Sequence, residues 1–215
     1  MSISCLCGKV SFTLTIPIPV YRIECGCVDC RQALEYAASK GGPPAPTLPD
    51  LWYFKNDSFQ SKGSYDDIIW AKLREKGSSV RCMSKCCNST LLVHHPFYRD
   101  NLTMVFEQTC EMENIDDEAI PHPKIRSTMK DFPKDLIGDL KPFHPKTSVD
   151  ENNLDCLGDY ASLEESGAEF GPLILTPITN PSGETTRAHI IKWCAATQGP
   201  ILNLELVEGE RFKKF

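Results

Sequence analysis

Residues 25–30 read Cys25-Gly26-Cys27-Val28-Asp29-Cys30 and place three thiols within six residues. Two further clusters accompany them, Cys5-Leu6-Cys7 and the segment from Cys82 to Cys87, so that the first 87 residues hold eight of the eleven cysteines. Thiols two or three residues apart do not easily form a disulfide, whose Cα atoms lie roughly 5.5 Å apart, but they converge readily on one soft cation. The sequence therefore predicts a zinc protein, with disulfide bonds as the competing interpretation.

Length and composition predict a globular chain with its own core. The 215 residues are 41% hydrophobic, which suffices for one domain or for one domain with a long appendage. No run of about 18 apolar residues is present, and the N-terminal residues have neither the basic nor the apolar region of a secretory signal. We therefore expect no membrane association and a reducing, cytoplasmic compartment, in which cysteines stay available as metal ligands.

Charge divides the chain near residue 146. Residues 1–146 carry 18 basic and 18 acidic side chains, whereas residues 147–215 carry 5 basic and 11 acidic ones. This balance argues against a nucleic-acid partner, because phosphate binding requires a basic face. Since the polar stretch 147–153 follows, we predict a zinc-binding domain over 1–146 and an acidic extension over 147–215 that packs on or beside it. A surface loop within a single domain is the alternative for this boundary.

Periodicity in the first part of the chain is mostly that of short strands. Residues 9–16 alternate apolar and polar side chains, and Pro17 and Pro19 end the pattern. Further strands are expected at 51–54, 78–82, 90–94 and 102–106, and one helix at 29–39, ended by the Gly-Gly-Pro-Pro stretch at 41–44. The extension contains one strand-like run at 171–178 and one helix-like run at 185–196. The fold class that follows is mainly β, with an α+β extension.

The spacing of the thiols suggests two kinds of zinc site. Cys25, Cys27 and Cys30 offer three ligands on one tight loop, which leaves a fourth zinc position for water or substrate. Cys5 and Cys7 offer two ligands and need partners, and the segment 82–87 is the later cluster rich enough to provide them. A zinc ion with four protein thiolates is structural, whereas one with an open position can polarise a carbonyl, activate water or bind a substrate thiol.

Three stretches, in order, resemble the motifs of the glutathione-dependent formaldehyde-activating (GFA) family, which also includes centromere protein V. These stretches are 4–12 with Cys5-Leu6-Cys7, 24–31 with Cys25, Cys27, Cys30 and Arg31, and 81–91 with Cys87 and Leu91. The likeness continues weakly through 59–65 and 114–117 and fades by about residue 146. It implies a small zinc-stabilised β-tent fold with one structural and one catalytic zinc ion.

The resemblance assigns Cys25, Cys27 and Cys30 to the catalytic zinc, and Cys5, Cys7 and Cys87 to the structural one. The fourth structural ligand departs from the family pattern, because Ser84 stands at a family cysteine and Asn88 at the glycine. Asparagine tolerates the left-handed backbone that glycine usually supplies, so the second change is mild. We favour Cys82 as the compensating ligand, since it lies two residues before Ser84 and on the same side of an extended chain. Cys86, a three-coordinate site and an empty site are the alternatives.

The resemblance further implies a carbon–sulfur lyase or synthase that acts on a thiol adduct such as S-hydroxymethylglutathione. Arg31 beside Cys30 is a candidate for pairing with a substrate carboxylate, and a salt bridge within the loop is the alternative. The expected partner is a small molecule, glutathione or a glutathione adduct, and a homodimer stays open. The extension is a candidate for covering the active-site mouth, for dimerisation or for shaping a larger binding site.

Two other functions remain. The same zinc chemistry could serve an isomerase, cyclase or lyase with a larger carbonyl or thioether substrate. A non-enzymatic, zinc-stabilised binding module is the other alternative, although such a role is expected to need a basic or low-complexity arm and the extension here is acidic.

Overall fold

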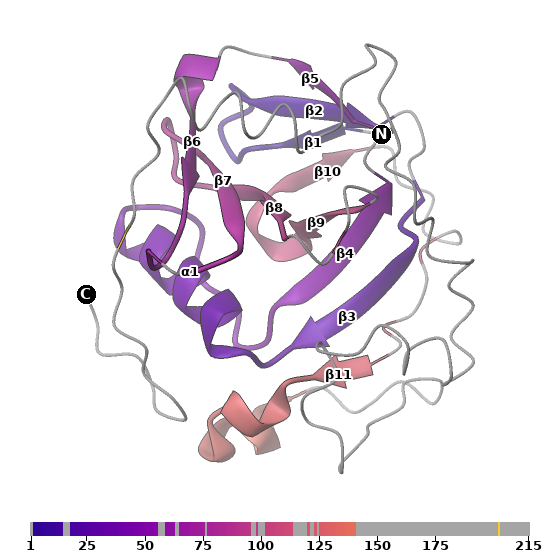
Figure 1. The fold of residues 1–215 in the computed structure, drawn as a ribbon, viewed down its shortest axis with the longest axis vertical. Coiled ribbons are helices and arrows are strands. Elements are labelled where there is room, and N and C mark those ends of the chain that lie inside the picture. The colour runs from indigo at the N-terminus through magenta and orange to yellow at the C-terminus, as the bar shows by residue number, and fades with distance from the viewer. Residues whose placement is uncertain are drawn as a thin grey trace.

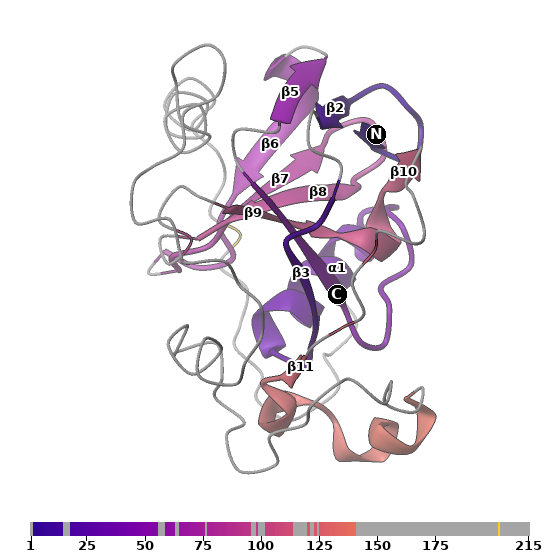
Figure 2. The same ribbon diagram turned by 90° about the vertical axis from the view of Figure 1, so that its right-hand side faces the viewer.

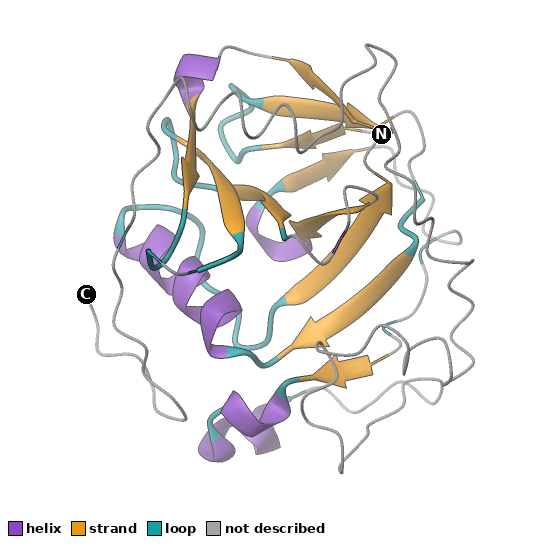
Figure 3. Ribbon diagram, in the orientation of Figure 1, coloured by secondary structure: helices purple, strands orange, loops and turns teal. Residues whose placement is uncertain are grey.

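The structure of the protein, a computed structural model, describes residues 2–14, 18–55, 59–62, 65–75, 77–95, 98, 102–113, 120, 123, 125–140 and 202. These residues form two sheets and one long helix (Figures 1 and 3). The mainly β class expected from the sequence is confirmed. The predicted extension, 147–215, lies outside the described residues apart from Leu202, and so do its expected strand and helix.

The smaller sheet is antiparallel and has the strand order β10-β1-β2-β5. Its strands are β1 (Ser2–Ser4), β2 (Ser11–Leu14), β5 (Phe59–Lys62) and β10 (Glu111–Glu113). In β2 the side chains of Phe12 and Leu14 are buried and that of Thr13 is exposed, as the alternating pattern predicts. This sheet therefore covers the core with one face only.

The larger sheet has the order β11-β3-β4-β9-β8-β7-β6, with β11 parallel to β3 and the other pairs antiparallel. Its strands are β3 (Tyr21–Cys25), β4 (Asp50–Lys55), β6 (Ile68–Ala71), β7 (Val80–Ser84), β8 (Thr90–His94), β9 (Leu102–Phe106) and β11 (Ile125–Ser127). Every residue of β8 and β9 is buried, because both faces of these central strands are covered.

The two faces of the larger sheet pack against different layers. On β4, Trp52 and Phe54 join the core shared with the smaller sheet, whereas Leu51 and Tyr53 join a second core that includes Leu34 of α1 (Val28–Ser39). The smaller sheet and α1 thus lie on opposite sides of the larger sheet (Figures 1 and 2). Short 3-10 helices complete the described fold: η2 (Tyr65–Asp67), η4 (Glu107–Thr109), η6 (Met129–Asp131) and η7 (Lys134–Asp139).

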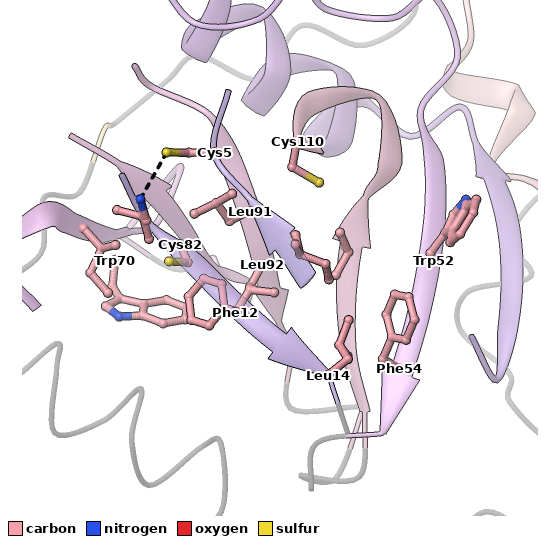
Figure 4. Packing of buried hydrophobic residues seen from close by; sticks show 14 residues of the cluster. Cys5, Phe12, Leu14, Trp52, Phe54, Trp70, Cys82, Leu91, Leu92 and Cys110 are labelled. Atoms are coloured by element: carbon pink, nitrogen blue, oxygen red, sulfur yellow. Dashed lines mark hydrogen bonds between the residues drawn. The ribbon is translucent and has the colours of Figure 1, made fainter. Parts of the chain in front are cut away.

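The core between the sheets holds large side chains from both. Leu14 of β2 lies beside Phe54 of β4, whereas Phe12 of β2 lies near Trp70 and Leu92, and Cys82 of β7 pairs with Trp70 across the β6–β7 ladder (Figure 4). Burial of aromatic side chains of this size is the main stabilising term of such a sandwich.

The expected helix at 29–39 is confirmed as α1, and the strands expected at 90–94 and 102–106 coincide with β8 and β9. The strands expected at 9–16, 51–54 and 78–82 overlap β2, β4 and β7. Strands β1, β3, β5, β6, β10 and β11 were not predicted.

Two further observations concern the rest of the chain. None of the described helices combines the length and the apolar character that a membrane crossing requires. The backbone N–H of Leu202 donates to the carbonyl of Lys72 at 2.9 Å, and its side chain packs near Ala33 and Leu73. Residue 202 therefore lies against α1 and the segment after β6.

Candidate metal centres

Four cysteines from two turns come close together in the structure. Cys5 and Cys7 lie between β1 and β2, Cys86 and Cys87 lie between β7 and β8, and all four sulfurs are within 4.8 Å of one another. The Sγ–Sγ distances are 3.5 Å for Cys5–Cys7, 3.6 Å for Cys5–Cys86, 3.1 Å for Cys7–Cys86 and 3.9 Å for Cys86–Cys87. Four sulfurs 2.3 Å from a central zinc ion would be about 3.8 Å apart, so this group fits a closed tetrahedral site.

The β1–β2 turn is held by its own backbone. The N–H of Cys5 donates to Val10 O at 2.9 Å, and the N–H of Gly8 donates to Cys5 O at 2.8 Å. Gly8 has φ of +73°, which favours glycine at that position. The N–H of Val10 points back at Cys5 Sγ at 3.4 Å (Figure 4).

The β7–β8 turn places Cys86 and Cys87 opposite the first pair. Asn88 has φ of +51°, so the expected left-handed residue after Cys87 is confirmed. Its N–H donates to Ser84 O at 3.0 Å, and its side-chain amide donates to Lys40 O at 2.7 Å. This left-handed residue closes the turn, and the amide joins it to the end of α1.

Ser84 takes a supporting place in this turn. Its hydroxyl accepts from the N–H of Ser89 at 3.1 Å and lies 3.4 Å from Cys87 Sγ. The Ser89 hydroxyl is 3.3 Å from the same sulfur. Burial raises the pKa of Cys87, but the hydrogen bonds from Ser84 and Ser89 outweigh it and lower that pKa to about 6. Burial and the neighbouring thiols of Cys7 and Cys5 raise the pKa of Cys86 to about 12. Four ionised sulfurs at this spacing therefore require a cation between them.

Cys82 is not part of this group, so the preference for it is corrected in favour of Cys86. Cys82 is fully buried in the core between the sheets, paired across the ladders with Trp70 and Leu92. The β7–β8 register shifts between Cys82 and Met83 because Leu91 is an extra residue in β8, whereas β7 pairs regularly with β6 from Arg81 to Ser84. Cys82 also lies within β7, before the turn begins. Cys86 lies in the turn itself, which brings its sulfur close to the other thiols.

The second group consists of Cys25, Cys27 and Cys30, whose sulfurs lie within 4.8 Å of one another. Cys25 ends β3, Cys27 is the N-cap of α1 and Cys30 lies in its first turn. The Cys27 sulfur accepts from the N–H of Cys30 at 3.3 Å. Cys25 and Cys30 are buried, whereas Cys27 is half-buried. No fourth His, Cys, Asp or Glu side chain joins this group in the part of the chain that the structure describes.

The three thiols strongly affect one another. Hydrogen bonds from Cys27 and Cys30 hold the pKa of Cys25 well below its ordinary value. The bond to Cys25 raises the pKa of Cys27 to about 12, and bonds to Cys25 and Cys27 raise that of Cys30. One thiolate therefore forms readily in this loop, but three form only if a cation compensates them.

Arg31 supports this loop from inside the protein. Its Nε donates to Gly26 O at 3.1 Å, its Nη2 donates to Asp131 O at 2.6 Å, and the guanidinium lies over the Phe132 ring. The side chain is buried. The geometry does not support the expected pairing with a substrate carboxylate. Arg31 instead joins the three-thiol loop to the segment 131–132, and its charge lies close to the thiolates of Cys27 and Cys25.

Gly26 is packed too tightly for a side chain. A Cβ at this position would lie 3.0 Å from Met129 Sδ, 3.0 Å from Thr128 O and 3.1 Å from Phe132 Cβ. We expect Gly26→Ala to displace the loop and to lower the free energy of unfolding by about 1–3 kcal/mol. Its metal affinity, measured by competition with a chromophoric chelator, should fall at the same time. Gly138→Ala is the matched control, because a Cβ there meets nothing within 4 Å. Equal behaviour of the two variants would contradict this role of Gly26.

Polar side chains from different parts of the chain interact near the three thiols. Asp29, in the first turn of α1, pairs with Arg74 at 2.6 Å, and Arg74 also donates to Gln32. The guanidinium of Arg81 lies near the same turn, with Nη2 3.5 Å from Asp29 O. Arg81 was noted only as the residue before Cys82 in the family-like stretch. No local spacing in the sequence connects β7 with the start of α1.

Comparisons with known proteins add little to this geometry. No protein-family model and no curated protein matches the chain. Among solved structures, a Rhodobacter sphaeroides protein of known crystal structure aligns with 55% of this chain and 93% of its own, at 11% identity and a TM-score of 0.35. A likeness of this degree carries no argument about fold or function.

Proposed function

We propose that the protein is a zinc-dependent enzyme that makes or breaks a carbon–sulfur bond at Cys25, Cys27 and Cys30. One observation carries the proposal: three converging thiols have no fourth ligand among the described residues, whereas the group of Cys5, Cys7, Cys86 and Cys87 has four. Soft thiolates in tetrahedral groups favour zinc. We assign the four-thiol group to a structural ion and the three-thiol group to a catalytic one.

Charge favours sulfur chemistry over water activation. Three thiolates and Zn²⁺ carry a formal charge of −1, so an ion in this group is a weak Lewis acid. When bound, it would accept a substrate thiol as its fourth ligand and favour the thiolate form. The three cysteines fix the direction from which that sulfur approaches, because Cys25 and Cys30 are buried and only Cys27 lies at the half-exposed side.

The chain positions the substrate sulfur at the N-terminus of α1. The partial positive charge of this helix end stabilises a thiolate there. In the thiol-addition direction, the sulfur attacks an electrophilic carbonyl carbon, a carbon–sulfur bond forms, and the proton of the thiol ends on the former carbonyl oxygen. The lyase direction reverses each of these steps. With glutathione and formaldehyde the product is S-hydroxymethylglutathione, which is the reaction implied by the family resemblance.

Zinc content and turnover test the proposal together. Protein purified under reducing conditions should contain two zinc ions per chain by elemental analysis. Exchange between free glutathione and S-hydroxymethylglutathione, followed by NMR, should be faster with the protein than without it. Two zinc ions without acceleration for glutathione or for other small thiols would argue for a binding module. A single zinc ion, retained by the four-thiol group, would refute a catalytic metal at Cys25, Cys27 and Cys30.

A further inference from the structure

Arg81 lies on the face of the larger sheet that packs against α1. It pairs across the β7–β8 ladder with Val93, which in turn pairs with Met104 of β9. Directly opposed residues of antiparallel strands project to the same face. Val93 and Met104 belong to the core that contains Cys25 and Cys30. The Arg81 side chain therefore shares a layer with the three-thiol group.

The guanidinium of Arg81 is buried without a counter-charge. Its side chain is 3% exposed, and its Nε has no hydrogen-bond partner. Its Nη2 makes one long contact, 3.5 Å to the backbone oxygen of Asp29. Among the described residues no carboxylate pairs with Arg81, because the Asp29 carboxylate is engaged by Arg74. A buried cation without a carboxylate or phosphate partner is costly.

The other buried or half-buried arginines are better satisfied than Arg81, either by a carboxylate or by several short hydrogen bonds. Arg31 donates to two backbone oxygens, Arg22 pairs with Asp50, and Arg126 pairs with Glu24. Arg31 is also the arginine whose charge compensates the thiolates of Cys27 and Cys25. The charge of Arg81 thus has no assigned task within the described fold.

The surroundings of Arg81 suit the binding of a small anion beside the thiols. Asp29 lies between Cys27 and Cys30, within one helical turn of both. His95 follows Val93 by two residues. Burial and the charge of Arg81 both lower the pKa of His95. The Tyr98 ring lies 5.8 Å from that of His95 and 5.6 Å from that of Tyr53, and both tyrosines belong to the same core as Val93.

We propose that Arg81 binds the carboxylate of a substrate whose sulfur reaches the three-thiol group, so that the substrate is a thiol acid. The binding of the substrate sulfur at the three thiols rests on the proposed function, whereas the binding of its carboxylate rests on Arg81 alone. The planar guanidinium can engage a carboxylate through two parallel hydrogen bonds, which fixes the substrate at a second point and orients its sulfur.

The test compares thiols that differ only in charge. The probes are 3-mercaptopropionate, 4-mercaptobutyrate and 6-mercaptohexanoate, each paired with its neutral amide. Binding to the full chain loaded with Co²⁺ is measured by calorimetry and by the thiolate-to-cobalt absorption band. At the best chain length we expect the acid to bind about 10- to 100-fold more tightly than its amide.

Arg81→Met should bring the affinity ratio of acid to amide close to one and leave the affinity for the amide within about twofold. Arg81→Lys keeps the buried charge and removes the two-point geometry, so it should retain only part of the preference. This variant also decides the question if Arg81→Met does not fold. Arg22→Met is the matched control, because Arg22 pairs across β3–β4 with Trp52 on the opposite face of the sheet. This variant should still bind the acid more tightly than the amide.

The outcomes separate this inference from the proposed function. Equal binding of acid and amide, or a preference that survives both Arg81 variants, would overturn the role of Arg81 and leave the sulfur ligand intact. Acid binding that depends on Arg81 but leaves the cobalt band unchanged would support the anion site and refute the substrate sulfur as fourth ligand. Failure of every probe to bind would refute both.

Discussion

Cys27→Ser is expected to reduce turnover by more than about a thousandfold and to remove one of two zinc ions, while the protein stays folded. The size of the loss follows from the several kcal/mol of stabilisation that a metal ion supplies in a transition state. Cys27 is the most exposed of the three thiols in its group, so its replacement creates no cavity in the core.

Serine is the informative replacement at this position because Cys27 is also the N-cap of α1. Its sulfur accepts from the N–H of Cys30. A serine hydroxyl makes the same capping bond but is a poor zinc ligand. Cys27→Ala removes both functions, and we expect it to be less stable than Cys27→Ser by about 1 kcal/mol.

Elemental analysis, glutathione exchange and urea unfolding of the two variants separate catalysis from stability. Both variants should lose activity. The N-cap hydrogen bond, kept in Cys27→Ser and lost in Cys27→Ala, should account for the difference between their free energies of unfolding. Retention of two zinc ions and of turnover in Cys27→Ser would refute a catalytic metal at this loop. Global unfolding of Cys27→Ser would show that the three-thiol group is structural.

The central part of the fold was predictable from the sequence because its signal is local. Strands β8 and β9 are mostly apolar, since both faces are buried, and Pro or Gly residues mark the ends of the neighbouring segments. Helix α1 was predictable from the Gly-Gly-Pro-Pro stretch that follows it. These elements need no information about their neighbours.

Strand β3 was missed because its polar residues are satisfied only across the sheet. Arg22 pairs with Asp50 of β4, and Glu24 pairs with Arg126 of β11, which is 102 residues away in the sequence. Without those partners, the sequence of β3 resembles that of a polar loop. Strands β1, β10 and β11 have three residues each, too few to show a period.

In the candidate sites, too, some features are visible in the sequence and others depend on the fold. Each thiol pair or triplet is visible in the sequence, because its successive members are at most three residues apart. The fourth thiol of the first group depends on the shape of a turn: Asn88 in the left-handed region closes the loop that presents Cys86 and Cys87. Arg81 became a candidate only when the pairing of β7 with β8 placed it on the face of α1.

The distinction between Cys86 and Cys82 gives the last prediction. Cys86 is exposed, so Cys86→Ala removes almost no packing, yet it should cost one zinc ion and lower the free energy of unfolding by roughly 3 kcal/mol or more. The loss is large because zinc binding contributes on the order of 10 kcal/mol to the folding of small zinc domains. Cys82→Ala, at a fully buried position, should cost only about 1 kcal/mol of packing and retain both zinc ions.

A rescue variant makes this comparison sharper. The Ser84 hydroxyl is 3.4 Å from Cys87 Sγ, so a thiol at position 84 lies within reach of the same ion. We expect Ser84→Cys to restore the second zinc ion and most of the stability when it is added to Cys86→Ala. Elemental analysis and urea unfolding of the single and double variants provide the measurement. Loss of zinc from Cys82→Ala but not from Cys86→Ala would refute the assignment of Cys86, because a buried core thiol would then hold the ion in place of an exposed one.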